Sequence, residues 1–198
     1  MNHPLFLALV VTFFSFQVQS KAQSCLYSFD LDKSLVQGTG YKFTDKLGVT
    51  ATFAGVELNS NKAQKNKKDL FNGLVVSVDL LSIDSENGLR DMNMRETLFA
   101  NILGDSKVTV AVEKVTDKKI ETKITVNQNS QKVLFDYKMT DSGIEAKGLF
   151  DALKFALGDQ IAALKKRCGS LHTGDDGKSV TWTDFDLEVK AYFKKTCS

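Results

Sequence analysis

Apolar and polar residues alternate in two neighbouring segments, 41–44 and 49–53, which are separated by the polar segment 45–48. Alternation with a period of two predicts β-strands that have one buried and one solvated face. The segment between them ends in glycine and carries the polar residues that a hairpin turn needs. Together, the three segments predict an antiparallel hairpin near the start of the chain.

The same hairpin carries two signs of curvature. Gly38 and Gly40 lie two residues apart, so they share one face of the first strand, where they allow a sharp bend or a close approach to the backbone. The apolar phase of the second strand slips at Ala54 and Gly55, where we expect a β-bulge that redirects the strand. Bends and bulges of this kind start the closure of a sheet into a barrel.

Strand patterns return several times along the rest of the chain. Short strands joined by tight polar turns indicate an antiparallel barrel or sandwich rather than parallel βαβ units. The expected strands fall at residues 74–83, 107–113, 120–126, 133–139, 144–150 and 185–193.

Two segments change to a helical period. Residues 87–99 place apolar side chains three and four positions apart, which predicts a short helix over an open barrel end or a sheet face. Residues 149–167 predict a second helix, with an apolar stripe of Leu153, Leu157, Ile161 and Leu164 and with three cations at its C-terminal end.

The N-terminus has the pattern of an export signal. Residues 5–16 are almost entirely apolar, and Ser20-Lys21-Ala22 fits the small-x-small cleavage pattern. We therefore expect a signal peptide over residues 1–22, a single domain over residues 23–198, and a periplasmic or secreted protein. Without Lys21 the chain holds 25 basic and 24 acidic residues, a near-neutral balance that argues against a nucleic-acid-binding protein.

Residues 59–69 form a charge-rich segment between two strand patterns. We expect a solvated loop. The alternative is a basic lip that makes transient contact with a membrane surface through Lys62, Lys65, Lys67 and Lys68.

The chain has three cysteines, so an exported protein is expected to form one disulfide and to keep one free thiol. In a closed barrel with an even number of strands the first and last strands are neighbours, which favours a Cys25–Cys197 bond and leaves Cys168 over. The alternative for Cys25 is lipid attachment, because residues 22–25 loosely resemble a lipoprotein cleavage box.

The sequence offers little for catalysis or metal binding. His172 is the one histidine outside residues 1–22, so we expect no multi-histidine metal site, and we interpret it as a loop residue that hydrogen-bonds its turn. Arg90 and Asp91 form either an internal salt bridge or polar contacts at the mouth of a pocket. An isomerase or hydrolase built from His172, Arg90 and Asp91 is the alternative from another class.

Several short segments, in order, resemble the YceI-like family. Residues 48–53 resemble its G-V-x-G-x-F hairpin arm, and residues 82–99 resemble its I-D-T-x-N-x-x-R-D-x-H-L…F-F segment. Residues 171–182 resemble a tail found in a subset of the family. This chain departs from the pattern at Asn93, where a histidine is usual, and at Ala51, where a glycine is common.

The resemblance implies a mainly β protein, an eight-stranded antiparallel lipocalin-like barrel with one or two short helices, exported to the periplasm. It also implies a non-catalytic binder of a long apolar lipid, a polyisoprenoid or isoprenoid quinone, with no other cofactor. A ligand-free stress-response protein with a filled barrel is a further alternative. We expect a monomer or weak dimer, with Arg90 and Asp91 at the pocket mouth. The expected wall of the lumen consists of Tyr41, Phe43, Val49, Phe53, Leu98, Phe99, Phe135, Phe150 and Phe155.

Overall fold

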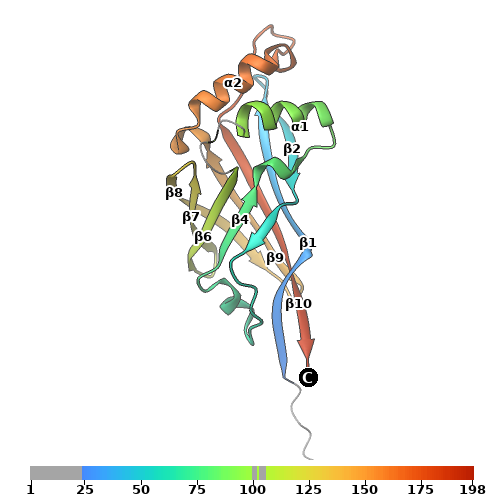
Figure 1. Cartoon of the computed structure of the whole chain (residues 1–198), viewed down its shortest axis with the longest axis vertical. Coiled ribbons are helices and arrows are strands. Elements are labelled where there is room, and N and C mark those ends of the chain that lie inside the picture. Colours follow the sequence, from blue (N-terminus) through green and yellow to red (C-terminus); the bar gives the residue numbers. More distant parts are fainter. Residues whose placement is uncertain (1–23, 100–101, 103–105) are drawn as a thin grey trace, which may run out of the picture.

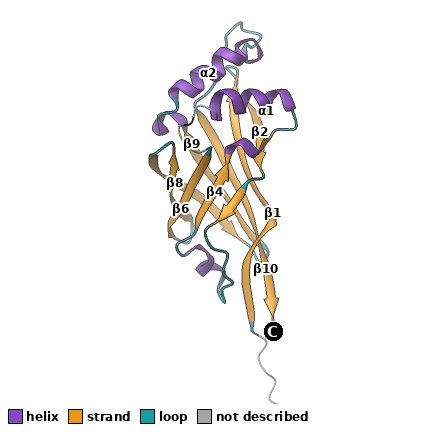
Figure 2. Cartoon of the chain, viewed as in Figure 1, coloured by secondary structure: helices purple, strands orange, loops and turns teal. Residues whose placement is uncertain are grey.

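The computed structural model describes residues 24–99, 102 and 106–198, so the signal-peptide prediction for residues 1–22 lies outside the described part. One antiparallel sheet curls into a tapered body, and the two α-helices lie together at one end of it (Figure 1, Figure 2). The strands are β1 (Cys25–Lys42), β2 (Leu47–Phe53), β3 (Val56–Leu58), β4 (Val75–Asp79), β5 (Ile83–Asp84), β6 (Lys107–Val115), β7 (Lys119–Val126), β8 (Asn129–Met139), β9 (Gly143–Asp151) and β10 (Asp184–Cys197).

The order of strands in the sheet is β3-β4-β6-β7-β8-β9-β10-β1-β2-β5. β3 therefore begins the order and β2 is its next-to-last strand, although only Ala54 and Gly55 separate the two in the chain. Hydrogen bonds tie this connection to the strand beside it, because Asp79 N donates to Gly55 O at 2.7 Å and Gly55 N donates to Ser82 Oγ at 2.8 Å. The Ala54-Gly55 connection, where the apolar pattern of the sequence slips, thus links the two sides of the curled sheet.

The prediction of a mainly β, curled antiparallel sheet is confirmed, but the predicted count of eight strands is wrong. The described residues form ten strands because two arms of the sheet are interrupted. One arm breaks at Ala54-Gly55 between β2 and β3, and its partner breaks at the 3₁₀ turn η2 (Leu80–Ser82) between β4 and β5. Asp79 caps that turn, since its Oδ1 accepts from Leu81 N at 2.9 Å.

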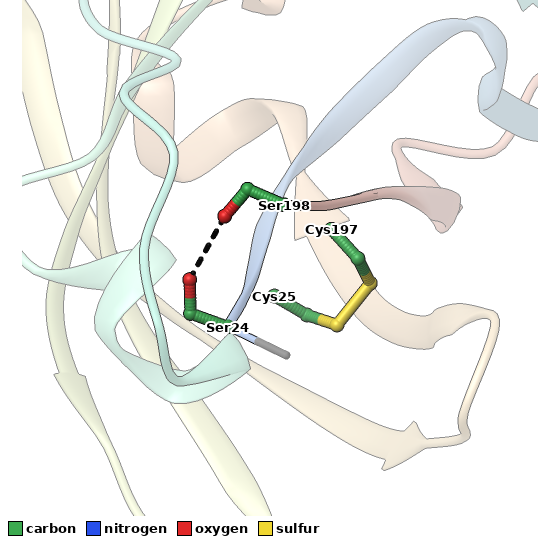
Figure 3. The surroundings of a disulfide bond; sticks show 4 residues. All are labelled: Ser24, Cys25, Cys197 and Ser198. Atoms are coloured by element: carbon green, nitrogen blue, oxygen red, sulfur yellow. Dashed lines mark hydrogen bonds between the residues drawn. A yellow bond between two sulfur atoms is a disulfide. The ribbon is translucent and has the colours of Figure 1, made fainter. Parts of the chain in front are cut away.

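β1 and β10 form the longest pairing and bring the start of β1 beside the end of β10 at the tapered end (Figure 1). Cys25 pairs with Cys197 in register, with their Cα atoms 4.1 Å apart, and the two form the predicted disulfide. Beside it, the Oγ atoms of Ser24 and Ser198 lie 3.0 Å apart (Figure 3). The disulfide occupies the sulfur that lipid attachment at Cys25 would need.

The first predicted helix is present as α1 (Gly88–Met94), followed by a π-helical turn, η3 (Arg95–Phe99). Asn87 caps it, because its Oδ1 accepts from Arg90 N at 3.0 Å. α1 lies with α2 (Gly158–Cys168) over the same end of the sheet (Figure 2).

The predicted start of the second helix at residue 149 is wrong. β9 continues to Asp151 and a 3₁₀ turn, η4 (Ala152–Phe155), follows before α2 begins at Gly158. The stripe consequently loses Leu153, which is 56% exposed, while Leu157, Ile161 and Leu164 are buried. Further 3₁₀ turns are η1 (Lys67–Phe71) and η5 (Gly169–His172).

Candidate ligand-binding cavity

The inner face of the curled sheet encloses a cavity of about 490 Å³. Its wall continues from the middle of the sheet, at residues such as Val76, Val110 and Ile124, to the helical end, at residues such as Arg90 and His172. Most wall side chains are aliphatic or aromatic. Cavities of this size and lining bind small molecules mainly by burying their apolar surface.

Most of the side chains predicted to form a lumen wall do border the cavity. They come from β2, η3, β8 and β9: Val49, Phe53, Leu98, Phe99, Phe135 and Phe150. Their contact with a ligand stays a prediction.

Tyr41 also borders the cavity, but its side chain belongs to the other face of β1. The Tyr41 hydroxyl donates to Asp186, and the ring lies beside Thr39 and Gly48. The hydrogen bond to Asp186 raises the pKa of Tyr41, with smaller contributions from burial and from the charges of Asp186 and Asp184. The inward positions of β1 are Gly38 and Gly40 instead.

Three glycines lie under aromatic rings: Gly38 and Gly40, which border the cavity, and Gly148, which lies under the wall residue Phe135. A Cβ atom at Gly38 would lie 3.5 Å from Phe53 Cε2, and one at Gly40 would lie 3.0 Å from Phe185 Cε1. A Cβ at Gly148 would lie only 2.9 Å from Phe135 Cδ1 and Cε1. The glycines therefore give the rings room on a crowded inner face, rather than acting only as points of bending.

Phe185, Leu187 and Val189 on β10 also line the cavity. They were not among the predicted wall residues, although their alternation with polar residues could have identified them.

Phe43 and Phe155, both predicted to line the cavity, are not part of its wall. Phe43 lies in the turn after β1 with a φ of 63°, and its carbonyl accepts from Trp182 Nε1 at 2.8 Å. Phe155 is only 1% exposed and stacks on Phe150 with ring centroids 4.3 Å apart. The Phe43 ring therefore packs on a loop, and the Phe155 ring packs behind the wall residue Phe150.

Arg90 and Asp91 have different roles. Asp91 is buried and accepts from the Ser85 backbone N at 3.0 Å and from the Ser85 hydroxyl, which fixes the chain ahead of α1. Arg90 borders the cavity and donates from Nη1 to Ser85 O at 3.3 Å. No ion pair joins the two residues in the described structure, because adjacent positions on a helix do not face each other.

His172 lies in η5 at the helical end and also borders the cavity. Its Nδ1 lies 2.6 Å from Thr181 Oγ1, which agrees with the predicted hydrogen bond within its own loop. Burial lowers the pKa of His172, and the nearby charge of Lys42 lowers it further. Because Asp91 is held by Ser85 and does not line the cavity, the described side chains do not bring His172, Arg90 and Asp91 together as a catalytic group.

Cys168, at the end of α2, is a free thiol that is 5% exposed and borders the cavity. Burial raises the pKa of this thiol, and the charge of Arg167 opposes that effect. Within residues 24–99, 102 and 106–198, no group of three or more His, Cys, Asp or Glu side chains is placed to hold a metal ion.

The lysine-rich segment lies away from the helical end, toward the tapered end (Figure 1). Two of its lysines are engaged: Lys67 pairs with Asp141 at 3.1 Å, and Lys68 pairs with Asp117 at 3.3 Å. Lys62 and Lys65 are exposed. This segment does not border the cavity, and no helix in the described part of the chain is long and apolar enough to cross a membrane.

Comparison with known proteins gives one family and several structural neighbours. The family model described as a YceI-like domain matches residues 27–192. No curated protein sequence matches the chain.

Three solved structures illustrate the likeness in fold. A polyisoprenoid binding domain from Saccharophagus degradans, implicated in plant cell wall breakdown, is 14% identical, with a TM-score of 0.59 over 86% of this chain and 98% of that one. Burkholderia cenocepacia BcnA is 10% identical, with a TM-score of 0.56 over 84% and 99%. The Campylobacter jejuni YCEI protein is 13% identical, with a TM-score of 0.51 over 79% and 89%.

Proposed function

This protein belongs to the family of YceI-like domains, and on that premise we propose that its cavity binds one long apolar lipid without catalysing a reaction. The observation that carries the proposal is the cavity of about 490 Å³ with its aliphatic and aromatic wall. The polyisoprenoid-binding neighbour makes a polyisoprenoid or isoprenoid quinone the first ligand class to test.

The proposed architecture is a lipocalin-like barrel of eight arms, if β2 with β3 and β4 with β5 are each counted as one bent arm. A barrel of about eight strands has room for one slender ligand. Burial contributes about 0.8 kcal/mol per methylene group. Affinity should therefore rise with chain length until the cavity is filled and then level off.

The direct test is organic extraction of the protein purified from its native host, followed by mass spectrometry of the extract. A stoichiometric isoprenoid or other long-chain lipid is the expected result. Protein that carries no lipid, and that binds none of a series of isoprenoids added to it, would contradict the proposal.

A matched pair of variants on β6 localises the ligand. Val110 borders the cavity, whereas its neighbour Thr109 does not, since successive strand residues face opposite sides. Val110→Trp should fill the cavity and abolish lipid co-purification, and Thr109→Trp should leave it unchanged. Equal lipid content in both folded variants would place the lipid elsewhere.

We also propose that the protein is exported to the periplasm as a monomer, after cleavage near Gln23. The disulfide supports this location, because such bonds persist in oxidising compartments. N-terminal sequencing of protein recovered from the periplasmic fraction tests export and cleavage, and an intact N-terminus in the cytoplasmic fraction would refute both. Analytical ultracentrifugation of the purified protein tests the monomeric state, which a dimer mass would refute.

A further inference from the structure

The charged side chains on the cavity wall are all of one sign. Lys42 and Arg90 border the cavity, whereas no Asp or Glu among the described residues does so. Several cations elsewhere on the surface are paired with carboxylates, as in Lys46–Asp184 at 2.9 Å and Arg167–Glu96 at 3.2 Å. The described cavity wall, in contrast, carries cations and no carboxylate.

Neither of these two cations has a carboxylate partner within the part of the chain that the structure describes. Lys42 Nζ donates to Leu171 O at 3.3 Å and lies 4.5 Å from the centroid of the Phe43 ring. Arg90 uses Nη1 on Ser85 O at 3.3 Å. Both side chains are half-buried. A partly desolvated cation without a counter-ion is unfavourable, and an anion in the cavity would offset that cost.

A third polar residue of the wall leaves a donor group. Asn93 is 6% exposed and borders the cavity, and its Oδ1 already accepts from Arg167 Nε at 3.0 Å. Its amide nitrogen, which can only donate, is the atom left for a ligand. The two cations and this amide nitrogen are therefore three groups on the wall that can donate to an anion.

These groups lie at the open, helical end of the molecule. Arg90 follows Leu89, which is 60% exposed, and Lys42 is bonded to Leu171, which is 55% exposed. Both leucines border the cavity as well. A wall residue that is also solvent-exposed marks an opening. The cations therefore stand where the head group of a ligand would remain after its tail has entered the apolar interior.

We propose that the ligand is an amphiphile whose head group is an anion, a carboxylate or a phosphate, held at the opening by Lys42 and Arg90. This inference rests on the proposed lipid-binding function and specifies its ligand class. Guanidinium and ammonium groups bind carboxylate and phosphate oxygens through charge-assisted hydrogen bonds. The apolar tail would lie along the sheet toward Val110 and Ile124.

The test uses the full mature chain, freed of bound lipid, with pairs of ligands that differ only in the head group. Oleate is compared with oleyl alcohol, and farnesyl phosphate with farnesol, by calorimetry at pH 8. We expect the anion of at least one pair to bind about 10- to 100-fold more tightly than its alcohol, as expected for charge-assisted hydrogen bonds. The pair that shows the preference distinguishes a carboxylate from a phosphate.

Variants then assign the preference to the two cations. Lys42→Gln and Arg90→Gln should each weaken binding of the preferred anion roughly tenfold and change binding of its alcohol less than about twofold. Lys138→Gln, at an exposed position on β8 away from the cavity, is the matched control and should change neither. Melting curves of all three verify that they are folded.

The outcomes separate this inference from the function on which it rests. Equal binding of anion and alcohol by the wild-type protein would overturn the anionic head group and leave lipid binding intact. An anion preference that survives in the double variant of Lys42 and Arg90 would overturn the assignment to these residues. Failure of all four ligands to bind, together with a lipid-free extract of the native protein, would overturn the proposed function itself.

Discussion

Removing the disulfide between Cys25 and Cys197 should destabilise the protein strongly while leaving the cavity unchanged. The bond closes a loop with a sequence separation of 172 residues. The loop-closure relation gives an entropy loss in the unfolded chain worth about 5 kcal/mol at 25 °C for a loop of that length. Because measured effects usually fall below this ceiling, we expect the double variant Cys25→Ser, Cys197→Ser to lose about 3–5 kcal/mol of unfolding free energy.

The assay is equilibrium unfolding in urea, followed by fluorescence of Trp182. Wild-type protein under reducing conditions should show the same loss as the double variant. Ser198→Ala is the matched control at the same end of the sheet, because it removes the contact with Ser24 and keeps the disulfide. We expect this control to change the unfolding free energy by less than about 0.5 kcal/mol.

A loss of less than about 1 kcal/mol in the double variant would refute the reasoning, since the unfolded chain would then be restricted by something other than the disulfide. Ligand affinity provides a second check. The disulfide lies at the tapered end, far from α1 and α2 (Figure 1). Lipid binding by the folded double variant should therefore equal that of the wild type, and its loss would show that the two ends of the sheet are coupled.

Three further predictions concern the cavity wall. Gly148→Ala brings a Cβ within 2.9 Å of the Phe135 ring. It should lower the unfolding free energy by about 1–3 kcal/mol in urea unfolding. Adding Phe135→Leu should recover part of that loss. Burial lowers the pKa of His172, so the unfolded state binds more protons than the folded state near the ordinary pKa of histidine. The unfolding free energy, measured by urea unfolding, should therefore fall as the pH drops from 7.5 to 5.5. His172→Gln should reduce this dependence of the unfolding free energy on pH. Burial raises the pKa of the Cys168 thiol, so this thiol should react slowly with a small maleimide. The reaction should be slower still once lipid fills the cavity that Cys168 borders. An unchanged rate would place the lipid away from α2.

The parts of the fold that the sequence predicted well are those decided by neighbouring residues. β6 to β9 are consecutive antiparallel strands joined by tight turns, so their alternation and their turn residues specify them locally. The helix at 87–99 was predictable for the same reason, because Asn87 supplies its cap within the same segment. The Cys25–Cys197 bond followed from the expectation that the first and last strands pair.

The packing on the inner face of β1 could not be predicted because it depends on residues far away in the chain. Tyr41 borders the cavity as predicted, but the structure also places Gly38 and Gly40 there and covers them with rings from other strands. Phe185, which lies over Gly40, is 145 residues further along the chain. A single-strand pattern cannot distinguish a glycine that bends a strand from one that makes room for such a ring.

The polar end of the cavity could be predicted only in part, since its members come from three separate segments. Lys42 ends β1, Arg90 lies in α1 and His172 lies in η5. Arg90 was expected at the pocket mouth and does border the cavity, whereas Lys42 was not expected there. Among the lysines, the sequence drew attention to the lysine-rich segment, where Lys67 and Lys68 are paired with aspartates.

The glycine–aromatic pairs also explain why the cavity stays open although its wall is rich in large side chains. A ring that packs over a glycine of the neighbouring strand uses space that a side chain there would occupy. Phe53 over Gly38, Phe185 over Gly40 and Phe135 over Gly148 follow this arrangement on three different strand pairs. A Cβ added at Gly38 would be in ordinary contact with its ring, whereas one added at Gly40 or Gly148 would displace the ring, reducing both the stability of the sheet and the space for a ligand. Cavity volume and sheet packing are therefore set by the same few contacts, which is why we expect mutations there to affect both properties together.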